Sequence, residues 1–371
     1  MERALGIVNF SAKHIWVEGL QTYRPIGAFS FLGRYRVIDF PISNMSNSGI
    51  DQIQVYSQRK PRSLVEHVGT GRQYNINSKR GNLQILFSED STENIIYNND
   101  IRAFSQNLDD IEAANCSYVV IAPSYMVYSA DFAELLQEHI RSGADISLLY
   151  HSTENAREQF LSCSILNMGQ HRKVESISAN RGTARNRSIF MDTYLMKKDL
   201  FMDLVRKGKK LSSMYTLCDV VNSQCGELDV RGIAHRGYFA SITDFKSYYD
   251  ANISLIDFKT ASDLFKNDWP IYTRTNDSCP TQYFESASVK DSMVSNGCLI
   301  EGHLEHSVVG RGCVIQKGAV IRNCVLLPGV TVGKDAVLEN QVVDKNVRII
   351  HPVTISAQPQ NPGYIRKNDI I

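Results

Sequence analysis

Basic side chains near the start of the sequence are its first candidates for chemistry. Arg24, Arg34 and Arg36 lie close together, and His67 follows them in the chain. Guanidinium groups bind phosphate through paired, charge-assisted hydrogen bonds, so these residue types are suited to holding a small anion. The alternative is that the arginines pair with carboxylates at a domain or subunit interface. The residue types alone leave both roles open for these four residues.

Motifs for zinc chemistry or nucleophilic catalysis are absent from the sequence. The nine histidines include no His-Glu-x-x-His pairing, and no Gly-x-Ser-x-Gly turn occurs. The eight cysteines are scattered without a Cys-x-x-Cys pair. Free cysteine packs as a small hydrophobic side chain, so we expect reduced and mostly buried thiols. These patterns predict no resident metal.

The composition is that of a soluble globular protein. Hydrophobic residues make up 43% and charged residues 21% of the 371 residues, a length that allows two domains with separate cores. The formal net charge is +1, so no bulk field favours nucleic acid or an anionic membrane, while small anionic ligands remain possible. No apolar run reaches the length of a signal-peptide core or a membrane helix, which predicts a cytoplasmic protein.

Alternating apolar and amphipathic segments up to about residue 255 predict βαβ units on a mostly parallel sheet. Short apolar runs predict strands at Ala4–Val8, Gln52–Tyr56, Tyr118–Ala122 and Ile146–Tyr150. Apolar residues at helical spacing predict helices at Phe132–Arg141 and Asp244–Phe258. The first part of the chain is therefore expected to be an α/β domain.

A second rhythm begins at about residue 289. Aliphatic side chains then recur mostly every six residues, at Val294, Ile300, Val309, Ile315, Ile321, Leu327, Val332 and Leu338. This period is typical of a left-handed β-helix, in which triangular coils of three hexapeptides stack on one another. A β-sandwich is the alternative, but its strands would alternate with period two. Because the terminal coils of a β-helix need a partner, we expect an oligomer.

The pattern weakens between these two parts of the chain. Trp269-Pro270 and Cys279-Pro280 break any helix there, which predicts a linker. The expected organisation is an α/β domain over 1–256, a linker over 257–288 and a β-helix domain over 289–371.

The segment from Gly33 to Gly49 resembles the family of ADP-glucose pyrophosphorylases, the glucose-1-phosphate adenylyltransferases. It reads Gly-Arg-Tyr-Arg-Val-Ile-Asp-Phe-Pro-Ile-Ser-Asn-Met-Ser-Asn-Ser-Gly. Further matches are Ser63-Leu64-x-x-His67 and Ala103-x-x-Gln106-Asn107. The resemblance covers nearly the whole chain. It implies an N-terminal nucleotide-diphospho-sugar transferase domain, which is Rossmann-like, followed by a left-handed parallel β-helix of hexapeptide repeats.

The resemblance implies a reaction in which glucose 1-phosphate attacks the α-phosphorus of ATP and pyrophosphate leaves. Such a reaction needs neutralised phosphate charge and magnesium, which the family holds with two carboxylates. The matching positions carry Ser124, in Ala122-Pro123-Ser124, and Ser241, in the segment from Phe239 to Asp244. Neutral hydroxyl groups are weak ligands for a hard cation and leave its charge uncompensated.

The phosphate-binding loop and the lysine of the family are also missing. An ungapped count along the resemblance places the loop on residues 10–17, where Ser11 and Ala12 stand in place of glycines. The lysine aligns with Ile26, and a sugar-binding Glu-Lys-Pro falls on residues 179–181. These losses predict a chain that is catalytically deficient and carries no cofactor, with magnesium only in a catalytic partner.

The ligand-binding residues of the family that this sequence retains are basic. Arg24 and Arg36 match positions at which family members bind phosphate or sugar-phosphate effectors, and Arg34 and His67 lie nearby in the sequence. The resemblance thus implies that these four are candidate anion-binding residues, with ion pairs at a domain or subunit interface as the alternative. The resemblance therefore implies the allosteric, regulatory partner of a catalytic ADP-glucose pyrophosphorylase subunit in bacterial glycogen biosynthesis, assembled as a heterotetramer. One rival is an active nucleotidyltransferase with rearranged ligands such as Asp219, Asp229 or Asp244. The other rival is a free-standing sugar-phosphate sensor.

Overall fold

The structure is a computed structural model of the chain, and it describes all residues except 1, 11–14, 58–59, 78, 80 and 88–98. Its contacts divide the chain into two compact units. The first unit comprises residues 1–15, 38–243 and 267–272, and the second unit comprises residues 16–37, 244–266 and 273–371. Each unit therefore combines segments that are distant in the sequence.

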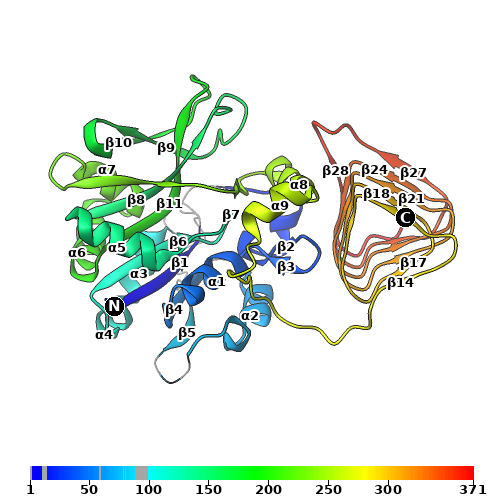
Figure 1. Ribbon diagram of the computed structural model, residues 1–371, viewed down its shortest axis with the longest axis horizontal. Coiled ribbons are helices and arrows are strands. Elements are labelled where there is room, and N and C mark those ends of the chain that lie inside the picture. Colours follow the sequence, from blue (N-terminus) through cyan, green and yellow to red (C-terminus); the bar gives the residue numbers. More distant parts are fainter. Residues whose placement is uncertain (1, 11–14, 58–59, 78, 80, 88–98) are drawn as a thin grey trace. The chain divides into compact units, whose positions relative to one another are not determined.

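The first unit is built on a nine-stranded sheet in which β1, β4, β5 and β6 run parallel (Figure 1). Its main path follows the order β10-β9-β11-β6-β1-β4-β5, while β8 pairs with β11 and β12. The bounds are β1 Ala4–Asn9, β4 Gln52–Ser57, β5 Asn82–Phe87, β6 Tyr118–Pro123, β8 Ile146–Thr153, β9 Ser164–Met168, β10 Val174–Ala179, β11 Arg187–Lys197 and β12 Val230–His235. The strands expected at 4–8, 52–56, 118–122 and 146–150 are confirmed.

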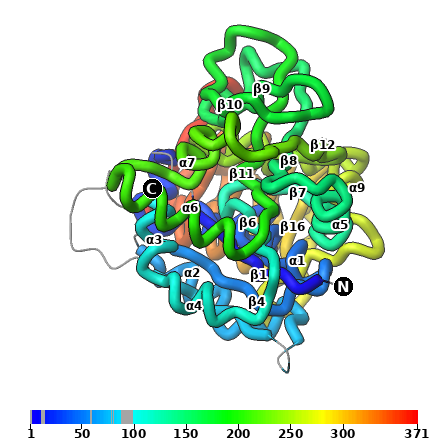
Figure 2. The backbone as a smooth tube through the Cα atoms, turned by 90° about the vertical axis from the view of Figure 1, so that its left-hand side faces the viewer, coloured from blue at the N-terminus to red at the C-terminus, as the bar shows by residue number. Residues whose placement is uncertain are grey.

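Helices cover both faces of this sheet (Figure 2). Leu5 and Ile7 of β1 belong to one core cluster with residues of α3, α6 and α7, whereas the alternate residue Gly6 faces α1. A Cβ atom at Gly6 would lie 2.6 Å from the Met45 sulfur, so glycine permits the close approach of α1. The helices are α1 Asp39–Asn47, α2 Arg62–Val68, α3 Asp100–Gln106, α4 Leu108–Ala113, α5 Phe132–Ser142, α6 Lys198–Leu211 and α7 Leu217–Gln224, with 3₁₀ turns at Arg72–Tyr74 and Gln170–Arg172.

Helix α5 illustrates how local signals set these bounds. Asp131 caps its start by accepting hydrogen bonds from the amides of Ala133 and Glu134. Gly143 ends it in the left-handed conformation, with a φ of 67°. The helix expected at 132–141 is therefore confirmed, and it extends through Ser142.

A separate two-stranded antiparallel sheet joins β7, Met126–Tyr128, to β13, Phe239–Ser241. Ser241 pairs with Met126, and the Ile242 amide donates to the Tyr125 carbonyl at 2.9 Å. Because β7 follows β6 after a short turn, this pairing brings the end of β13 to the carboxyl end of β6.

The second unit contains a left-handed β-helix of three five-stranded parallel sheets (Figure 1). The sheets are β14-β17-β20-β23-β26, β15-β18-β21-β24-β27 and β16-β19-β22-β25-β28. Their inward aliphatic side chains stack from coil to coil into one buried core. The bounds are β14 Gln282–Tyr283, β15 Ser288–Lys290, β16 Met293–Val294, β17 Leu299–Ile300, β18 His303–Glu305, β19 Val308–Val309, β20 Val314–Ile315, β21 Val320–Arg322, β22 Val325–Leu326, β23 Thr331–Val332, β24 Val337–Glu339, β25 Gln341–Val343, β26 Arg348–Ile349, β27 Thr354–Ser356 and β28 Gly363–Ile365.

The register of the repeat differs from the predicted one at a single aliphatic position. Leu326 pairs with Val309, where the six-residue count predicted Leu327. The cause is the length of the corners between strands. Ile315 pairs with Val332, which lies seventeen residues further on instead of the eighteen of three hexapeptides. A fixed six-residue count therefore fails wherever one corner is shorter.

Two earlier segments of the chain complete the second unit. They form 3₁₀ turns at Leu20–Thr22 and Ile26–Ala28, a hairpin of β2 Ser30–Phe31 and β3 Tyr35–Arg36, and helices α8 Phe245–Ser254 and α9 Phe258–Leu264. The Leu32 amide donates to the Asn252 side chain at 2.9 Å, which fixes the hairpin to α8. The helix expected over 244–258 is therefore α8 followed by the start of α9, and the range 257–288 contains α9 and β14.

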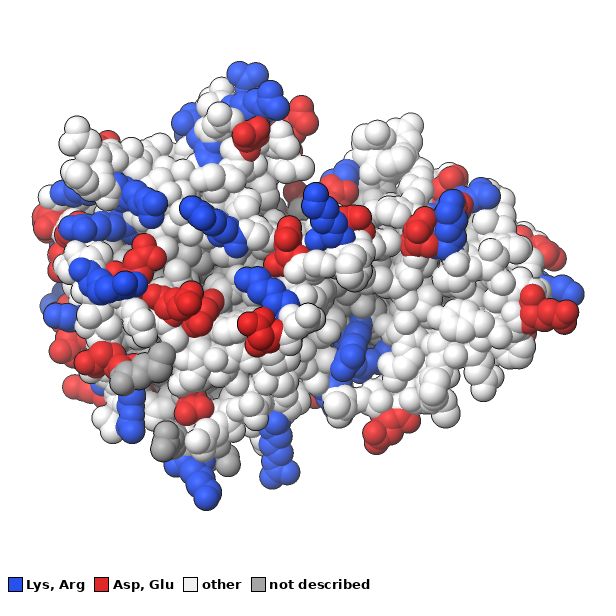
Figure 3. Space-filling model, viewed as in Figure 1, with Lys and Arg blue, Asp and Glu red and all other residues white. Residues whose placement is uncertain are grey.

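Burial and surface charge agree with the composition. Five of the eight free cysteines are buried, and only Cys279 is exposed, as expected for thiols that pack like hydrophobic side chains. On the face drawn in Figure 3, basic and acidic side chains are interspersed over each unit. Within the described part of the chain, no helix combines the length and apolar character needed to cross a membrane.

Candidate functional site

The carboxyl ends of β1 and β6 in the first unit meet at the place where the resemblance puts the reaction. Asn9 ends β1 and Ser124 follows β6, and the Ser124 amide donates to the Asn9 carbonyl at 2.7 Å. The β7–β13 sheet adds Ser241, because the neighbouring Ile242 bonds to Tyr125. The structure therefore brings together Ser124 and Ser241, the two positions matched to magnesium-binding carboxylates.

Neither serine contributes a charge at this place. Ser241 is 4% exposed, and its hydroxyl accepts a hydrogen bond from the Cys163 thiol at 3.4 Å. Ser124 is also buried. Hydroxyl and thiol groups leave the charge of a divalent cation uncompensated. Among the described residues, no group of three or more His, Cys, Asp or Glu side chains is placed to hold a metal ion. The side chains present here do not fit magnesium.

A buried carboxyl group that the sequence analysis missed lies beside Asn9. Asp100 accepts hydrogen bonds from the amides of Ile101 at 2.8 Å and Leu217 at 3.0 Å, and from the Asn9 side chain at 3.3 Å. Burial raises the pKa of Asp100 to about 7. Through its hydrogen bonds to Leu217 and Asn9, the Asp100 carboxyl group connects the start of α7 to the end of β1. Asn99 caps the start of α3, but no local pattern shows that the next residue, Asp100, is buried against Asn9 and Leu217.

Asp192 is a second carboxyl group in this region, and it occupies a break in β11. Its backbone is left-handed, with a φ of 44°, where the pairing of β11 with β8 shifts register. Its carboxylate accepts a hydrogen bond from the Tyr125 hydroxyl. The charge of Asp192 adds to the raised pKa of Asp100, after the larger effect of burial. Both carboxyl groups are therefore engaged in hydrogen bonds within the first unit.

The three carboxylates considered as substitute metal ligands all have structural partners. Asp219 forms a capping box at the start of α7. Asp229 pairs with Arg231 at 2.6 Å, and this hydrogen bond lowers the pKa of Asp229. Asp244 caps α8 by accepting from the Ser247 amide at 2.7 Å. These roles weigh against an active enzyme with rearranged ligands.

The second unit holds four basic side chains that we call the cationic cluster: Arg24, Arg36, Lys345 and Lys367. Arg24 is 3% exposed, and its Nη2 atom lies 2.6 Å from both oxygens of the Asp344 carboxylate. The Nη1 atom of Arg24 is buried and has no hydrogen-bond partner among the described residues. A buried donor without a partner is costly, so this geometry is suited to a further anionic group.

Lys345 shows how crowded the positive charge is. Burial and the neighbouring arginine charges lower the pKa of Lys345 to about 7, although Asp344 acts in the opposite direction. Lys367 also contributes to this effect, and its ammonium group lies 5.6 Å from the centroid of the Tyr23 ring. The single carboxylate of Asp344 therefore cannot neutralise all the positive charge of the cationic cluster.

The two lysines of the cationic cluster were not found from the sequence. The Asp344 carboxylate also accepts hydrogen bonds from the Tyr364 hydroxyl at 2.8 Å and from the Lys345 amide at 2.6 Å. These residues build one half of the cluster, and 320 positions separate Asp344 from Arg24. No local pattern links such distant residues, so only the fold reveals the group.

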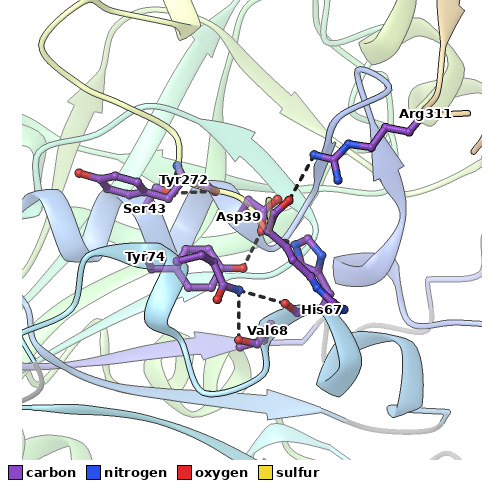
Figure 4. A network of polar contacts seen from close by, with 9 residues as sticks. Asp39, Ser43, His67, Val68, Tyr74, Tyr272 and Arg311 are labelled. Carbon is purple, nitrogen blue, oxygen red and sulfur yellow. Dashed lines mark hydrogen bonds and ion pairs between the residues drawn. The ribbon is translucent and has the colours of Figure 1, made fainter. Parts of the chain in front are cut away.

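Two of the predicted anion-binding residues, Arg34 and His67, are not members of the cationic cluster. Arg34 is exposed and lines a separate cavity of the second unit. His67 belongs to the first unit, where its Nε2 atom lies 2.7 Å from Asp39 (Figure 4). The Tyr74 hydroxyl donates to the same carboxylate oxygen at 2.6 Å. His67 is therefore a buried partner of the first residue of α1.

Comparison with known proteins agrees with this architecture. A family model described as nucleotidyl transferase matches residues 20–255, which is more than half of the chain. The chain belongs to the nucleotidyl transferase family. A second model, described as GlmU-like, C-terminal hexapeptide, matches residues 280–362 and so covers most of the β-helix.

Within the nucleotidyl transferase family, the similar relatives are named for glycogen synthesis. The chain is 30% identical over 324 residues to glycogen biosynthesis protein GlgD of Geobacillus stearothermophilus, covering 86% of this chain and 83% of the relative. It is 27% identical over 363 residues to the GlgD protein of Bacillus subtilis, covering 98% and 95%. A glucose-1-phosphate adenylyltransferase of Fervidobacterium nodosum is 27% identical over 356 residues, covering 94% and 84%.

Four further positions matched to motifs of the nucleotidyl transferase family carry neutral side chains: Ser11, Ala12, Ile26 and Asn180. Ser11 and Ala12, in place of the loop glycines, lie outside the described residues. Ile26 is buried and opens a 3₁₀ turn of the second unit, where the resemblance implied an amine. Asn180 is buried, and its side chain donates to the Ala156 carbonyl at 2.9 Å, so it closes a loop.

Proposed function

We propose that this chain is the catalytically deficient, regulatory subunit of a glucose-1-phosphate adenylyltransferase complex in bacterial glycogen biosynthesis. The complex makes ADP-glucose from ATP and glucose 1-phosphate in the cytoplasm. The observation that carries the proposal is the pair Ser124 and Ser241 at the ends of β6 and β13. An adenylyltransferase needs charged groups at this place, and the chain has hydroxyls there.

The chemistry of the first unit supports catalytic deficiency. Phosphoryl and nucleotidyl transfer depend on positioning and on positive charge around the transferred group. Ser241 is bonded to the Cys163 thiol, and Asp100 is held by backbone amides at the starts of two helices. A carboxyl group with a pKa of about 7 is partly protonated at neutral pH and is a poor magnesium ligand. In the proposal, magnesium belongs to the catalytic partner.

The second unit supports a regulatory role, because its cationic cluster is suited to bind a phosphate or sugar phosphate. The free Nη1 donor of Arg24 and the ammonium group of Lys345 offer charge-assisted hydrogen bonds to phosphate oxygens. An anion there would also relieve the repulsion between the basic side chains. A coupling free energy of ~1–3 kcal/mol between this group and a partner would change the partner's affinity for substrate by ~5–150-fold.

The β-helix supports assembly with a catalytic subunit. Its first coil exposes the apolar side chains of Tyr283, Phe284 and Val289. Strands β14, β15 and β16 end their sheets within the described part of the chain. Exposed sheet edges with apolar side chains are surfaces at which further chains attach. We therefore include a hetero-oligomer, of the heterotetramer type, in the proposal.

Rate assays with purified components test the proposed function. The chain alone, with ATP, glucose 1-phosphate and magnesium, should form ADP-glucose at the background rate. Added to a catalytic subunit, it should change that subunit's rate or its response to phosphate. A turnover of the chain alone of ~1 per second or more, which is usual for enzymes, would contradict catalytic deficiency. Anion binding without association with any catalytic subunit would favour a free-standing sensor.

A further inference from the structure

Two sheets of the β-helix have different outer faces. On the sheet β16-β19-β22-β25-β28, the outward side chains of Val308, Val325 and Val342 are buried, and α8 packs on β22. On the sheet β15-β18-β21-β24-β27, the middle residues of the strands, such as Leu304 and Ile321, point into the core (Figure 1). The first and third residues of each strand point outward and are exposed or half-buried. We call the surface formed by these outward residues the ladder face.

One column of the ladder face carries charges of alternating sign. The strand register places four charged residues next to one another in the order Lys290, Glu305, Arg322 and Glu339. The two oxygens of Glu305 lie 3.8 Å from the Lys290 ammonium group and 3.4 Å from the Arg322 Nε atom. Opposite charges on neighbouring strands stabilise the stack by ~0.2–1 kcal/mol per pair. Along the stack, the signs are therefore plus, minus, plus and minus.

The corners of the β-helix hold this charged column in register. Each charged residue comes directly before a corner residue with left-handed backbone, and these corner residues are Asp291, His306, Asn323 and Asn340. The backbone amides of the corners at His306, Asn323 and Asn340 each donate to the carbonyl of the charged residue one coil earlier, at 3.1 Å. The four charges are therefore fixed at the spacing of neighbouring strands, ~4.8 Å.

The other column of the ladder face carries little charge. It consists of Ser288, His303, Val320, Val337 and Thr354, which are paired in register from strand to strand. Val320 and Val337 are half-buried, although they point outward. The ladder face therefore combines a charged column with a column of small polar and apolar side chains, in which His303 is the one ionisable residue.

Four alternating charges are complementary to the same four charges in the reverse order. When two ladder faces meet with their stacks antiparallel, Lys290 of one copy faces Glu339 of the other. Glu305 of each copy then faces Arg322 of the other. A two-fold axis parallel to the strands, between β18 and β21, produces this arrangement and also places the two weakly charged columns against each other. An axis along the stack would instead pair like charges or place charges against the valines, and both are costly.

We propose that the ladder face binds a second copy of this chain, with the two β-helices antiparallel about a two-fold axis between β18 and β21. The face extends over five strands, or ~20 Å along the stack, which is small for a protein interface. The dissociation constant should therefore be in the range of ~10–100 µM. The proposal concerns the chain alone and does not depend on a catalytic partner or on the regulatory role.

Sedimentation velocity of the full chain between ~1 and ~300 µM tests this interface. Two variants make the column uniform in sign. Glu305→Lys with Glu339→Lys gives a positive column, and Lys290→Glu with Arg322→Glu gives a negative column. Each variant alone should dimerise about tenfold or more weakly than the parent chain, because like charges then face each other. An equimolar mixture of the two variants should restore dimerisation, because opposite columns then meet.

A fully inverted variant keeps the internal alternation, so it should keep the stability of the parent chain even if the uniform columns destabilise the stack. It carries Lys290→Glu, Glu305→Lys, Arg322→Glu and Glu339→Lys. It should dimerise with itself like the parent chain, because the inverted column is also complementary to its own reverse. With fluorescently labelled parent chain it should pair about tenfold or more weakly, because like charges meet. Arg348→Glu changes an exposed arginine on another sheet and should pair with labelled parent chain like the parent does.

Two results would overturn the proposal. The first is a parent chain that stays monomeric over the whole concentration range. The second is an inverted variant that pairs with labelled parent chain as tightly as the parent pairs with itself, because the copies would then associate through another surface. Neither result bears on the rate of a catalytic subunit, so the proposed function is tested separately.

Discussion

The strand ends of the first unit and the cationic cluster of the second unit differ in charge and in hydrogen bonding. At the strand ends, Ser124 and Ser241 provide hydroxyls, and the buried Asp100 is satisfied by backbone amides. In the cationic cluster, basic side chains surround the single carboxylate of Asp344, and Arg24 keeps a buried donor without a partner among the described residues. The strand ends of the first unit therefore lack a cluster of positive charge, whereas the cationic cluster has one, because each place is built by the packing of its own unit.

The largest expected effect in this comparison concerns Asp344→Asn. This change leaves the buried Arg24 without its counter-charge, so the second unit should lose ~3–5 kcal/mol of unfolding free energy. Sulfate should restore part of the loss, because an anion can take the place of the carboxylate. Thermal denaturation with and without sulfate measures both effects.

The control for this prediction is Asp335→Asn, which changes an exposed aspartate of the β-helix. It should alter stability by no more than ~0.5 kcal/mol. A melting temperature of Asp344→Asn equal to that of the parent chain would show that the carboxylate does not hold the cationic cluster together.

The second effect concerns the pH dependence of the first unit. The native pKa of Asp100 is about 7 and its ordinary value is 3.8, so the native state binds more protons between these pH values. The unfolding free energy should therefore fall as the pH rises from ~4 to ~7, by up to a few kcal/mol. In Asp100→Asn this decline should disappear, and the new amide can donate to the unpartnered Oδ1 atom of Asn9.

Urea denaturation at several pH values between 4 and 8 measures this decline. Asp109→Asn, at an exposed position of α4, is the matched control and should keep the pH dependence of the parent chain. An equal decline in the parent chain and in Asp100→Asn would mean that Asp100 is ionised in the folded protein like any surface carboxylate.

The third effect concerns anion binding at the cationic cluster. Sulfate is the suitable probe because it does not titrate near neutral pH. The pKa of Lys345 is about 7, so above this pH sulfate binding requires uptake of a proton. Sulfate affinity of the parent chain should fall by up to about tenfold per pH unit between pH 7 and 9. Lys345→Gln should bind sulfate more weakly at pH 7 and show little dependence on pH.

The control is Lys334→Gln, an exposed lysine of the β-helix, which should follow the parent chain. A sulfate affinity of the parent chain that stays constant from pH 7 to 9 would exclude Lys345 from the binding group.

The smallest expected effect concerns the strand ends. The double variant Ser124→Asp and Ser241→Asp should form ADP-glucose no faster than the parent chain. Two new carboxylates supply no positive charge for the phosphates, and catalytic groups that act as a unit are not restored one part at a time. A rate assay with ATP, glucose 1-phosphate and magnesium checks this. A rate gain of more than about a hundredfold would show that the two carboxylates are the main groups missing at the strand ends.

The elements of the fold were predictable where the signal was local. The apolar runs that gave β1, β4, β6 and β8 and the helical spacing of α5 are properties of neighbouring residues. The β-helix was predictable for the same reason, because inward side chains repeat along the chain. The miss at Leu327 has a physical cause: corner length is set by how each corner packs, and the aliphatic period does not report it.

The candidate sites were predictable only in part. The convergence of Ser124 and Ser241 followed from the family resemblance, and the β7–β13 pairing provides it. The roles of Asp100 and Lys345 could not be predicted, because their partners come from distant segments and their pKa values depend on burial. His67 and the arginines, which are neighbours in the sequence, belong to different units, and an anion-binding role of His67 stays a prediction.

The distance in sequence between Arg24 and Asp344 has a consequence for the order of folding. The two residues are 320 positions apart, so their contact closes a very long loop and contributes late in folding. During synthesis, residues 16–37 leave the ribosome long before the β-helix coils against which they pack. Arg24 therefore stays exposed to solvent until those coils form. Anion binding at the cationic cluster would therefore require the complete second unit, and a partly synthesised chain would bind no anion there.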